Sequence, residues 1–524
     1  MYLIDAAAMV VVLGGWATGA DPLNQQLADA LRRAIDRGDL PPGMKLPSER
    51  DLSTALGISR TTICAAYDRL RDEGIVRSRQ GSGTRVAVRG SDASGTFEPD
   101  APGLAQPHFA PRSGAREVDD RRTGSVGGRP RMVAAATFSG PSPVAGDPTS
   151  LPDTIAMTIG ALPGWPGVGE AIRATVAEEL PVLLDDFGYE PAGLAAMRVA
   201  VAAHLSRMGV RSRPDEVVIT SGAQQAVHLL ARELAGADGL VAIENPTYIG
   251  AIDSLRSVGA RMVPVPVGPD GLRVDILRQV IAAGLPSFVY VVPTYHNPTG
   301  VVMPEVARRE LARLSDEAGL VVVEDLTPAI GLGGSRFPGP IGSHATQERV
   351  ITVGSLSKGG WAGLRIGWIR AERSLISRLI ARKTVADHGT STLAQAIGAR
   401  MLDQVDAFEA HAERESALRR QTAYTALREL LPDWSWTEPA GGLSIWVRLP
   451  VGDAGMFARV AADHGVLIRP GSFASPDGGF RDHIRIAVGE SPERILEGIH
   501  RLATAWAAFT QRPARPGAAV AVSV

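Results

Sequence analysis

Apolar residues before position 90 recur at the spacing of short helices. Leu27, Leu31 and Ile35 would share one side of a helix that begins after Pro22. The turn-forming run Asp39-Leu40-Pro41-Pro42-Gly43 indicates that this helix has ended by then. The segment therefore opens with a helix and a turn.

Two further helices are predicted in the same segment, joined by a tight turn. Ser48-Glu49-Arg50-Asp51 has the form of a capping box, and the helix that it opens should run to about Leu56. Gly57-Ile58 makes the turn, and Ser59 is expected to cap a third helix. The apolar face of the third helix is formed by Ile63, Ala66, Tyr67 and Leu70.

A β-hairpin is predicted after these helices. Strand-like residues 75–79 and 84–88 flank Gln80-Gly81-Ser82-Gly83, whose glycines favour a tight reversal. Two helices joined by a turn and followed by a hairpin form a winged helix-turn-helix, which places the start of its second helix in the major groove of double-stranded DNA. The side chains and backbone expected at DNA are those of Arg50, Ser59, Arg60, Thr61, Thr62, Arg77, Arg79, Gly81 and Arg85.

The charge distribution supports this interpretation only weakly. The whole chain has a net charge of −2, whereas residues 21–90 carry twelve basic against nine acidic residues. One exposed arginine alone would more often be an ordinary surface residue. The joint order of cap, turn, Arg-containing helix start and glycine-rich loop is what indicates a DNA partner.

After position 150, apolar strand-like runs alternate with amphipathic helical stretches. Such strands between helices predict an α/β fold with a mostly parallel sheet that is covered on both faces. Residues from about 415 to 510 combine a long charged helix with short strands, which predicts a smaller α+β lobe. The clearest strands are Val217–Thr220, Leu240–Glu244, Phe288–Pro293, Val321–Asp325 and Val350–Ser355.

The segment between the two patterned regions lacks periodicity and is rich in Gly, Ala, Pro, Ser and Arg, which is typical of a flexible linker. The expected organisation is an N-terminal extension (1–20), the DNA-binding domain (21–88), the linker (89–150), the α/β domain with its lobe (151–510) and a C-terminal tail (511–524).

Lysine is rare in this chain, and that rarity draws attention to one position. Only Lys45, Lys358 and Lys383 occur among 54 basic residues. Lys358 follows a predicted buried strand, in Ser355-Leu356-Ser357-Lys358. A lysine in such a desolvated place has a lowered pKa and can form a Schiff base, which arginine cannot do.

Other polar residues at strand ends match what pyridoxal 5'-phosphate needs from a protein. Asp325 could pair with the pyridine nitrogen, Asn297 could donate to the ring hydroxyl, and Tyr248 could stack on the ring. Arg485 is a candidate clamp for a ligand carboxylate. Taken singly, Asp325 could equally cap a helix and Arg485 could be structural. The candidates for the phosphate cup are Ser221, Gly222, Ala223, Ser355, Ser357 and Arg365.

These motifs resemble two known families. Pro47–Leu52, Leu56–Thr62 and Gly81–Thr84 look like the GntR family of bacterial regulators, over about 65 residues. The segment with Ser221–Gln224, Asn297–Gly300 and Lys358 resembles fold-type I aminotransferases over about 350 residues. Both halves in this order resemble the MocR/GabR subfamily of GntR regulators.

The resemblance implies specific roles and partners. Lys358 would be the Schiff-base residue, with Asp325, Asn297, Tyr248 and the phosphate cup around the cofactor. Tyr189 matches a residue that reaches the phosphate of the neighbouring subunit, which implies a homodimer with shared sites. In such regulators the aminotransferase-like domain senses an amino compound, or pyridoxal phosphate itself, through the aldimine on the lysine.

One position departs from the aminotransferase pattern. A tyrosine usually lies shortly after the aspartate, whereas here Leu326-Thr327 occupies that region, with Thr327 at the expected place. Efficient transamination is therefore in doubt, and net turnover is not expected. Two alternatives to a sensing regulator stay open: an active aminotransferase with an accessory DNA-binding domain, and a DNA-binding protein with a vestigial cofactor fold. The intact Lys358, Asp325 and Asn297 argue against the second.

The remaining composition restricts other classes of function. The single cysteine, Cys64, excludes an intrachain disulfide and a cysteine-based metal site, so no metal is predicted and a cytoplasmic location is the simplest expectation. The apolar stretch Ala6–Leu13 is shorter than the roughly 20 residues of a membrane span. We expect it to form a short packing helix and expect no membrane partner.

Overall fold

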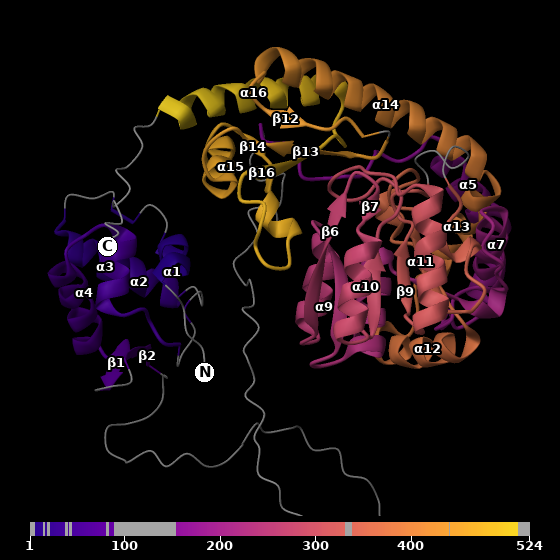
Figure 1. Ribbon diagram of the computed structural model, residues 1–524, viewed down its shortest axis with the longest axis horizontal. Helices are drawn as coiled ribbons and strands as arrows, with labels where there is room; N and C mark the ends of the chain where they lie inside the picture. The colour runs from indigo at the N-terminus through magenta and orange to yellow at the C-terminus, as the bar shows by residue number, and fades with distance from the viewer. Residues whose placement is uncertain are drawn as a thin grey trace, which may run out of the picture. The chain divides into compact units, whose positions relative to one another are not determined.

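The computed structural model describes residues 6–13, 16–17, 21–36, 40, 44–79, 83–87, 153–330, 338–439 and 441–511 (Figure 1). The chain divides into two compact units, one within residues 1–143 and the other within residues 144–524. The predicted linker (89–150), Gly81 of the predicted wing and the tail beyond Gln511 lie outside the described residues.

The first unit is a small helical domain with a two-stranded hairpin. Its elements are α1 (Ala6–Leu13), α2 (Leu23–Asp36), α3 (Glu49–Leu56), α4 (Arg60–Asp72), β1 (Val76–Arg79) and β2 (Gly83–Val86). Met9 of α1 is buried in the same apolar core as Leu27 and Leu31 of α2, so the apolar N-terminal stretch packs as a helix, as predicted. The predicted apolar face of α4 is also buried there.

The turn between α3 and α4 forms through caps that the sequence predicts. The Ser48 hydroxyl accepts the Asp51 N–H at 3.1 Å, and the Ser59 hydroxyl accepts the Thr62 N–H at 3.2 Å. Between the two helices, Gly57 adopts φ +67°, a left-handed conformation that side chains rarely tolerate. The caps therefore set where α4 starts.

The second unit is built on an eight-stranded sheet in the order β4-β11-β10-β9-β8-β5-β6-β7. The run from β10 through β9, β8, β5 and β6 is parallel, while β11 and β7 are antiparallel to their neighbours. The strands are β4 (Val217–Thr220), β5 (Leu240–Asn245), β6 (Arg261–Gly268), β7 (Gly271–Leu272), β8 (Phe288–Val291), β9 (Val322–Asp325), β10 (Val350–Ser355) and β11 (Gly367–Arg370). The predicted mostly parallel α/β sheet is confirmed.

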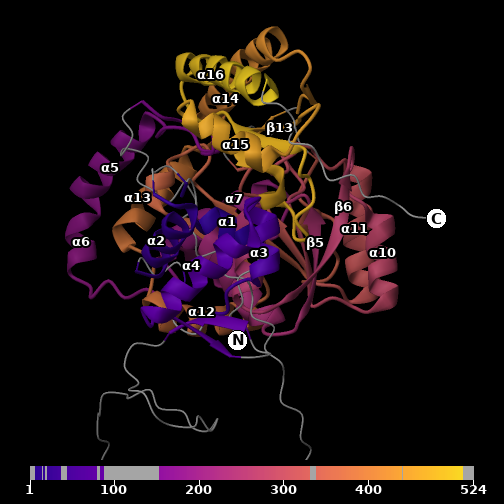
Figure 2. The ribbon, with the colours of Figure 1, turned by 90° about the vertical axis from the view of Figure 1, so that its left-hand side faces the viewer.

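Helices cover both faces of this sheet, because successive strand residues are apolar on both sides. Phe288 and Tyr290 of β8 belong to a core with helices α8, α9 and α12, whereas Val289 and Val291 face α10 and α11. Helices α5, α7 and α13 pack over the end of the sheet that contains β4 and β11. Figure 2 shows α5 and α13 on the opposite side of this unit from α10 and α11. The helices are α5 (Gly167–Glu178), α6 (Leu180–Leu184), α7 (Ala195–Arg207), α8 (Ala223–Leu230), α9 (Ile249–Ser257), α10 (Val274–Ala283), α11 (Glu305–Ala318), α12 (Arg373–Asp387) and α13 (Thr392–Asp403).

A smaller lobe follows, with its own apolar core. Helices α14 (Val405–Leu430), α15 (Ala454–Asp463) and α16 (Pro492–Gln511) pack on an antiparallel sheet in the order β12-β13-β16-β15 (Figure 1). The strands are β12 (Ser435–Trp436), β13 (Ser444–Arg448), β14 (Val466–Leu467), β15 (Arg469–Pro470) and β16 (His483–Ala487). The segment after residue 152 also joins the lobe, because β3 (Ile155–Ala156) pairs with β14. Among the described residues, no helix has the length and apolar character to cross a membrane.

Replacing Ser48 with Ala should loosen the start of α3. The substitution removes the acceptor for the Asp51 N–H, and the loss of such a cap costs about 1 kcal/mol. Hydrogen–deuterium exchange of the α3 amides, followed by mass spectrometry, should become roughly fivefold faster. Thr54→Ala is the control, since the Thr54 hydroxyl bonds only the Arg50 carbonyl one turn back. Unchanged exchange in Ser48→Ala would contradict the assigned cap.

Candidate functional site

The candidate site lies at the carboxyl edge of the large sheet. Strands β4, β5, β8, β9 and β10 all end there, and the residues that follow them turn into loops or helix starts. In open α/β sheets this edge is where ligands bind. The sequence-predicted residues between Ser221 and Arg365 are brought together because each follows one of these strands.

A cavity of about 210 Å³ occupies this edge. Eight of the predicted cofactor residues line it, and they come from five separate chain segments. The lining consists of Ala161, Ala223, Gln224, Tyr248, Val292, Asn297, Asp325, Thr327, Pro328, Ser355, Ser357, Lys358, Ala362 and Arg365. A nucleophilic amine, a carboxylate, hydroxyls and a guanidinium therefore line the same cavity.

Lys358 provides the amine of this cavity. Its Nζ donates to the Gly160 carbonyl at 2.5 Å, and the side chain is half-buried. Burial and, to a smaller extent, the positive charge of Arg485 lower the pKa of Lys358 to about 8, while the charge of Asp325 acts in the opposite direction. A substantial fraction of the amine is therefore neutral, and nucleophilic, near physiological pH.

Asp325 is held in place by two hydrogen-bond donors. The Tyr290 hydroxyl donates to Oδ2 at 2.6 Å, and the Thr327 N–H donates to Oδ1 at 2.8 Å. Burial and the charge of Asp325 raise the Tyr290 pKa well above its ordinary value, so this phenol stays a donor. Sequence reasoning missed Tyr290; the available signal was a hydroxyl in an otherwise apolar strand, next to the strand that ends at Asp325.

The residues predicted to bind the phosphate lie near the start of α8. Arg365 Nη2 donates to the Ser221 carbonyl at 2.9 Å, and the hydroxyls of Ser355 and Ser357 lie 2.8 Å apart. Gly222 has φ +87°, and a Cβ there would lie 2.6 Å from Arg365 Nη2. The geometry therefore requires glycine at this position, and the start of α8 supplies unpaired N–H groups suited to an anion.

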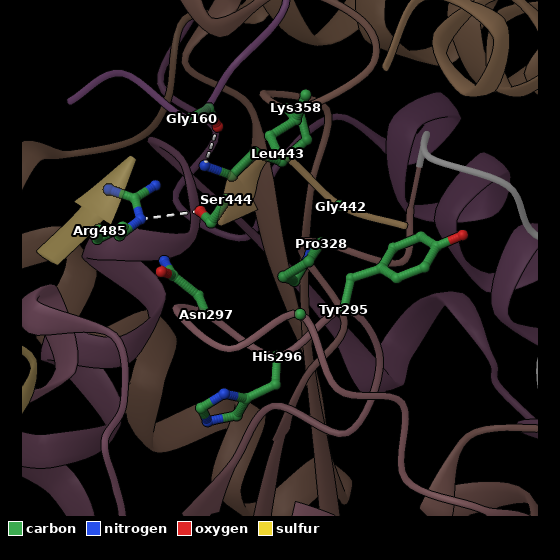
Figure 3. Close-up of a pocket in the computed structure, with 11 residues that line it drawn as sticks. Gly160, Tyr295, His296, Asn297, Pro328, Lys358, Gly442, Leu443, Ser444 and Arg485 are labelled. Carbon is green, nitrogen blue, oxygen red and sulfur yellow. Dashed lines mark hydrogen bonds between the residues drawn. The ribbon is translucent and has the colours of Figure 1, made fainter. Parts of the chain in front are cut away.

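Tyr248 and Asn297, two further predicted residues, line the cavity. The Tyr248 hydroxyl donates to Gln224 Oε1 at 2.9 Å, which fixes the ring at the cavity wall. Asn297 lies on a loop whose neighbouring residue His296 is buried and has its Nδ1 within 2.8 Å of the Thr299 hydroxyl. Figure 3 shows Asn297, Lys358 and Arg485 around a common space, with His296 on the other side of its loop.

The residues present fit pyridoxal phosphate. The Thr327 hydroxyl is buried at the cavity wall and has no hydrogen-bond partner in the described structure, so a bound polar group would satisfy it. Amine, carboxylate and phosphate cup have the chemistry that this cofactor requires. Pro328 also lines the cavity beside Thr327, so neither residue provides the phenol that is usual in aminotransferases.

A second cavity, of about 180 Å³, adjoins the first and contains Arg485. Arg485 Nε donates to the Ser444 hydroxyl at 2.8 Å and Nη1 to the Thr158 carbonyl at 3.2 Å, which orients the guanidinium (Figure 3). Burial lowers the Arg485 pKa to about 10, so the group stays charged at neutral pH. A Cβ at Gly160 would lie 2.5 Å from Arg485 Nη2, so the small residue makes room for the guanidinium.

Tyr189 lies apart from both cavities. Its side chain is 73% exposed, and its ring centroid is 6.0 Å from that of His388. Within one chain it therefore contributes nothing to the cofactor cavity, and its predicted role concerns a neighbouring subunit.

The predicted DNA-contacting residues lie at the start of α4, near the start of α3 and on the hairpin. Arg50, Ser59, Arg60 and Thr61 are exposed and Thr62 is half-buried. In the part of the chain that the structure describes, no ion pair engages Arg50 or Arg60. On the hairpin, the backbone positions of Arg77 and Arg85 face each other across the strands, and those of Arg79 and Gly83 are paired at the strand ends.

The described residues contain no group of three or more His, Cys, Asp or Glu side chains arranged to hold a metal ion.

Family comparisons match the two units separately. Residues 23–86 match the family described as bacterial regulatory proteins, gntR family, and residues 186–502 match aminotransferase class I and II. A crystal structure of α-aminoadipate aminotransferase from Thermus thermophilus, in complex with N-(5'-phosphopyridoxyl)-L-leucine, is 31% identical with a TM-score of 0.63. The match covers 70% of this chain and 95% of that one.

Two curated relatives match over nearly the whole length. The probable rhizopine catabolism regulatory protein MocR of Rhizobium meliloti is 30% identical, over 94% of this chain and 96% of that protein. The HTH-type transcriptional regulator TauR of Rhodobacter capsulatus is 29% identical, over 93% of this chain and 97% of that protein.

The lowered pKa of Lys358 predicts its reactivity. In cofactor-free protein, acylation of Lys358 by a small reagent, read by peptide mass spectrometry, should rise with pH and reach half its maximum near pH 8, because only the neutral amine reacts. A free lysine side chain in a short peptide, with its ordinary value of 10.5, is the reference. A midpoint equal to that of the peptide would show that burial does not control this amine.

Proposed function

This chain belongs to the MocR/GabR type of GntR-family transcription regulators, and on that premise we propose that it binds operator DNA through residues 21–88 and senses an amino compound or pyridoxal phosphate at Lys358. It is a pyridoxal phosphate-dependent regulator with a GntR DNA-binding domain and an aminotransferase-like domain. The two curated regulators match both domains in this order.

One observation carries the sensing part of the proposal. The amine of Lys358, the carboxylate of Asp325 and the guanidinium of Arg365 line a single cavity in a chain that also has a winged helix-turn-helix. A domain that no longer binds a cofactor would not need these three groups in one cavity. It would also not need the hydrogen bond from Tyr290 to Asp325 or the glycine at position 222. The intact cavity therefore favours a domain that still uses its cofactor.

Bound pyridoxal phosphate supplies an aldehyde that reacts with primary amines and an electron-withdrawing ring. Lys358 provides the amine, partly neutral because it is buried. Asp325, Asn297 and Tyr248 line the same cavity. They would hold the ring nitrogen, the ring oxygen and the ring face of the cofactor, respectively. The phosphate would be held by Ser221, Gly222, Ala223, Ser355, Ser357 and Arg365.

The effector would compete with Lys358 through its own amine. The Gly160 carbonyl, which accepts from Lys358 Nζ at 2.5 Å, would hold the lysine amine whenever that amine is not bound to the cofactor. Arg485, charged and oriented by Ser444 and Thr158, is suited to a carboxylate of the effector. Sensing therefore depends on groups that touch the ligand in one small space.

Exposed apolar side chains near Tyr189 support a homodimer with shared sites. Phe187 is 96% exposed, and Val182 and Leu184 of α6 are also exposed, although apolar side chains of this size usually avoid water. A second copy of the chain would cover them and would bring Tyr189 towards the partner's phosphate site.

An active aminotransferase with an accessory DNA-binding domain is the second candidate. The complete set of Lys358, Asp325 and Arg485 favours it, whereas Thr327 and Pro328 in place of a phenol disfavour it. Steady amino-group transfer at ordinary enzyme rates, about 1–1,000 per second, would favour the enzyme.

Lys358→Ala should abolish covalent cofactor attachment. The purified wild-type protein, supplied with pyridoxal phosphate, should show a visible absorbance band that survives gel filtration, and the variant should not, because no other amine lines the cavity. Lys45→Ala, in the DNA-binding domain, is the matched control and should keep the band. A colourless wild-type protein would overturn the sensing mechanism and leave a winged-helix binder alone.

Arg60→Ala should weaken specific DNA binding. A bidentate arginine–guanine contact is worth about 1–3 kcal/mol, so affinity for a footprinted operator should fall roughly 5- to 150-fold and sequence preference should relax. Wild-type binding should weaken as salt rises, since counterions are released. Arg69→Ala is the control at the far end of α4, where Arg69 is engaged by Glu73 at 3.4 Å. Equal losses in both variants would contradict the assigned orientation of α4.

A further inference from the structure

The second cavity has an unbalanced charge. Its lining contains Lys358, Arg469 and Arg485 and no carboxylate. The rest of the lining is Thr158, Gly160, Thr247, Tyr248, Ile249, Asn297, Pro470, Phe473 and Ala474. Two permanently charged guanidinium groups therefore share one small space without a counterion in its wall. Burying two like charges without a counterion costs free energy of folding, and a ligand that supplies negative charge would offset this cost.

Arg469 stands beside Arg485 because of strand register. The two residues face each other across the antiparallel pair of β15 and β16. Directly opposite residues have Cα atoms about 4.5–5.5 Å apart, and their side chains leave the same face of the sheet. The positive charge of Arg469 accordingly contributes to lowering the pKa of Arg485. Nothing in the sequence indicates this pairing, since the strands are short and separated by a loop.

Arg469 has no partner that accounts for its position. Within the described ranges, no ion pair or hydrogen bond engages its guanidinium. Asp253 is the carboxylate close enough to act on it electrostatically, but the ion pair of Asp253 is with Arg256, at 3.8 Å. Burial lowers the pKa of Arg469 more than Tyr248 and Asp253 raise it. The charge is thus partly desolvated and only weakly compensated.

Two hydroxyls in the same cavity also lack partners. Thr158 is 5% exposed and Thr247 is 1% exposed, and neither Oγ1 has a hydrogen-bond partner in the described structure. A buried hydroxyl left unpaired costs free energy, and most such groups in proteins are satisfied by a ligand or a neighbour. Both can donate to an anionic oxygen. The cavity therefore offers two guanidinium groups and two free hydroxyl donors.

We propose that the effector is an aminodicarboxylate, a small amino acid with a second acidic group, in which Arg485 binds one carboxylate and Arg469 binds the other. This inference rests on the proposed function, because it concerns the ligand whose amine meets Lys358. A monocarboxylate would occupy one guanidinium and leave the other uncompensated. Two carboxylates neutralise both, and the hydroxyls of Thr158 and Thr247 complete their hydrogen bonds.

Matched acids test the proposal on the full chain loaded with pyridoxal phosphate. L-Glutamate and L-2-aminoadipate are compared with L-norvaline and L-norleucine, and glutarate with pentanoate, by calorimetry and by the change in the visible spectrum for the amines. The dicarboxylates should bind at least tenfold more tightly than their monocarboxylate counterparts. Arg469→Gln should remove this preference and leave monocarboxylate affinity within twofold, whereas Arg485→Gln should weaken both groups.

Control variants distinguish a loss of ligand binding from a folding defect, and the ligand series distinguishes failure of the proposed sensing function from failure of the two-carboxylate site. Arg469→Lys should retain part of the preference, since it keeps the charge but loses the bidentate geometry. Arg448→Gln, which removes an exposed arginine paired with Asp482 at 2.9 Å, should change nothing. If no amine alters the spectrum but glutarate still outbinds pentanoate, the sensing function fails and the two-anion site stands. The inference is overturned if the protein binds dicarboxylates no more tightly than monocarboxylates. It is also overturned if Arg469→Gln keeps the preference for dicarboxylates, whatever the amines do to the spectrum.

Discussion

The desolvation of one amine is the constraint on which the ligand site depends. Lys358 is buried at the edge of the sheet, where loss of hydration lowers the pKa of its amine. The nearby positive charge of Arg485 also lowers this pKa. The carboxylate of Asp325 acts in the opposite direction and limits the shift. The balance leaves an amine that is neither permanently charged nor permanently neutral near pH 8. If Asp325 lay farther away, the neutral form of the Lys358 amine would be more strongly favoured. If the lysine were solvated, its amine would be almost fully protonated at neutral pH and would seldom react.

The parallel sheet fixes the relative positions of Asp325, which ends β9, and of Lys358, which follows β10. Asp325 is registered with Val353 on the neighbouring strand, so the aspartate and the serines before Lys358 leave the sheet at adjacent points. Tyr290 reaches Asp325 from the next strand. Asp325 is thus attached to a strand end and braced by a neighbouring strand. This arrangement limits how far the site can relax when a ligand enters.

Local patterns in the sequence were sufficient for the fold class, the caps of α3 and α4 and eight of the residues that line the cofactor cavity. Lys358, Asp325 and Asn297 follow apolar runs that are recognisable without any long-range information. Tyr290, Thr158 and Arg469 could not be assigned, because each acquires its meaning from a contact with a residue distant in the chain. The two-residue strand β3 was missed for a similar reason, because only its pairing with β14 defines it.

The two cavities are not independent, because Tyr248, Asn297 and Lys358 line both. A ligand in the cavity with the arginines must contact side chains that also form the wall of the cofactor cavity. Any free energy of interaction between the two occupants is reciprocal: if the cofactor changes the affinity for the ligand, the ligand changes the affinity for the cofactor by the same factor. Arg469 and Arg485 supply charge that is present throughout the physiological pH range, whereas Lys358 supplies an amine whose protonation varies. In the roles proposed for these residues, recognition of the acid groups and exchange at the amine would be carried out by different side chains. The site would then distinguish ligands by charge before any bond to the cofactor changes.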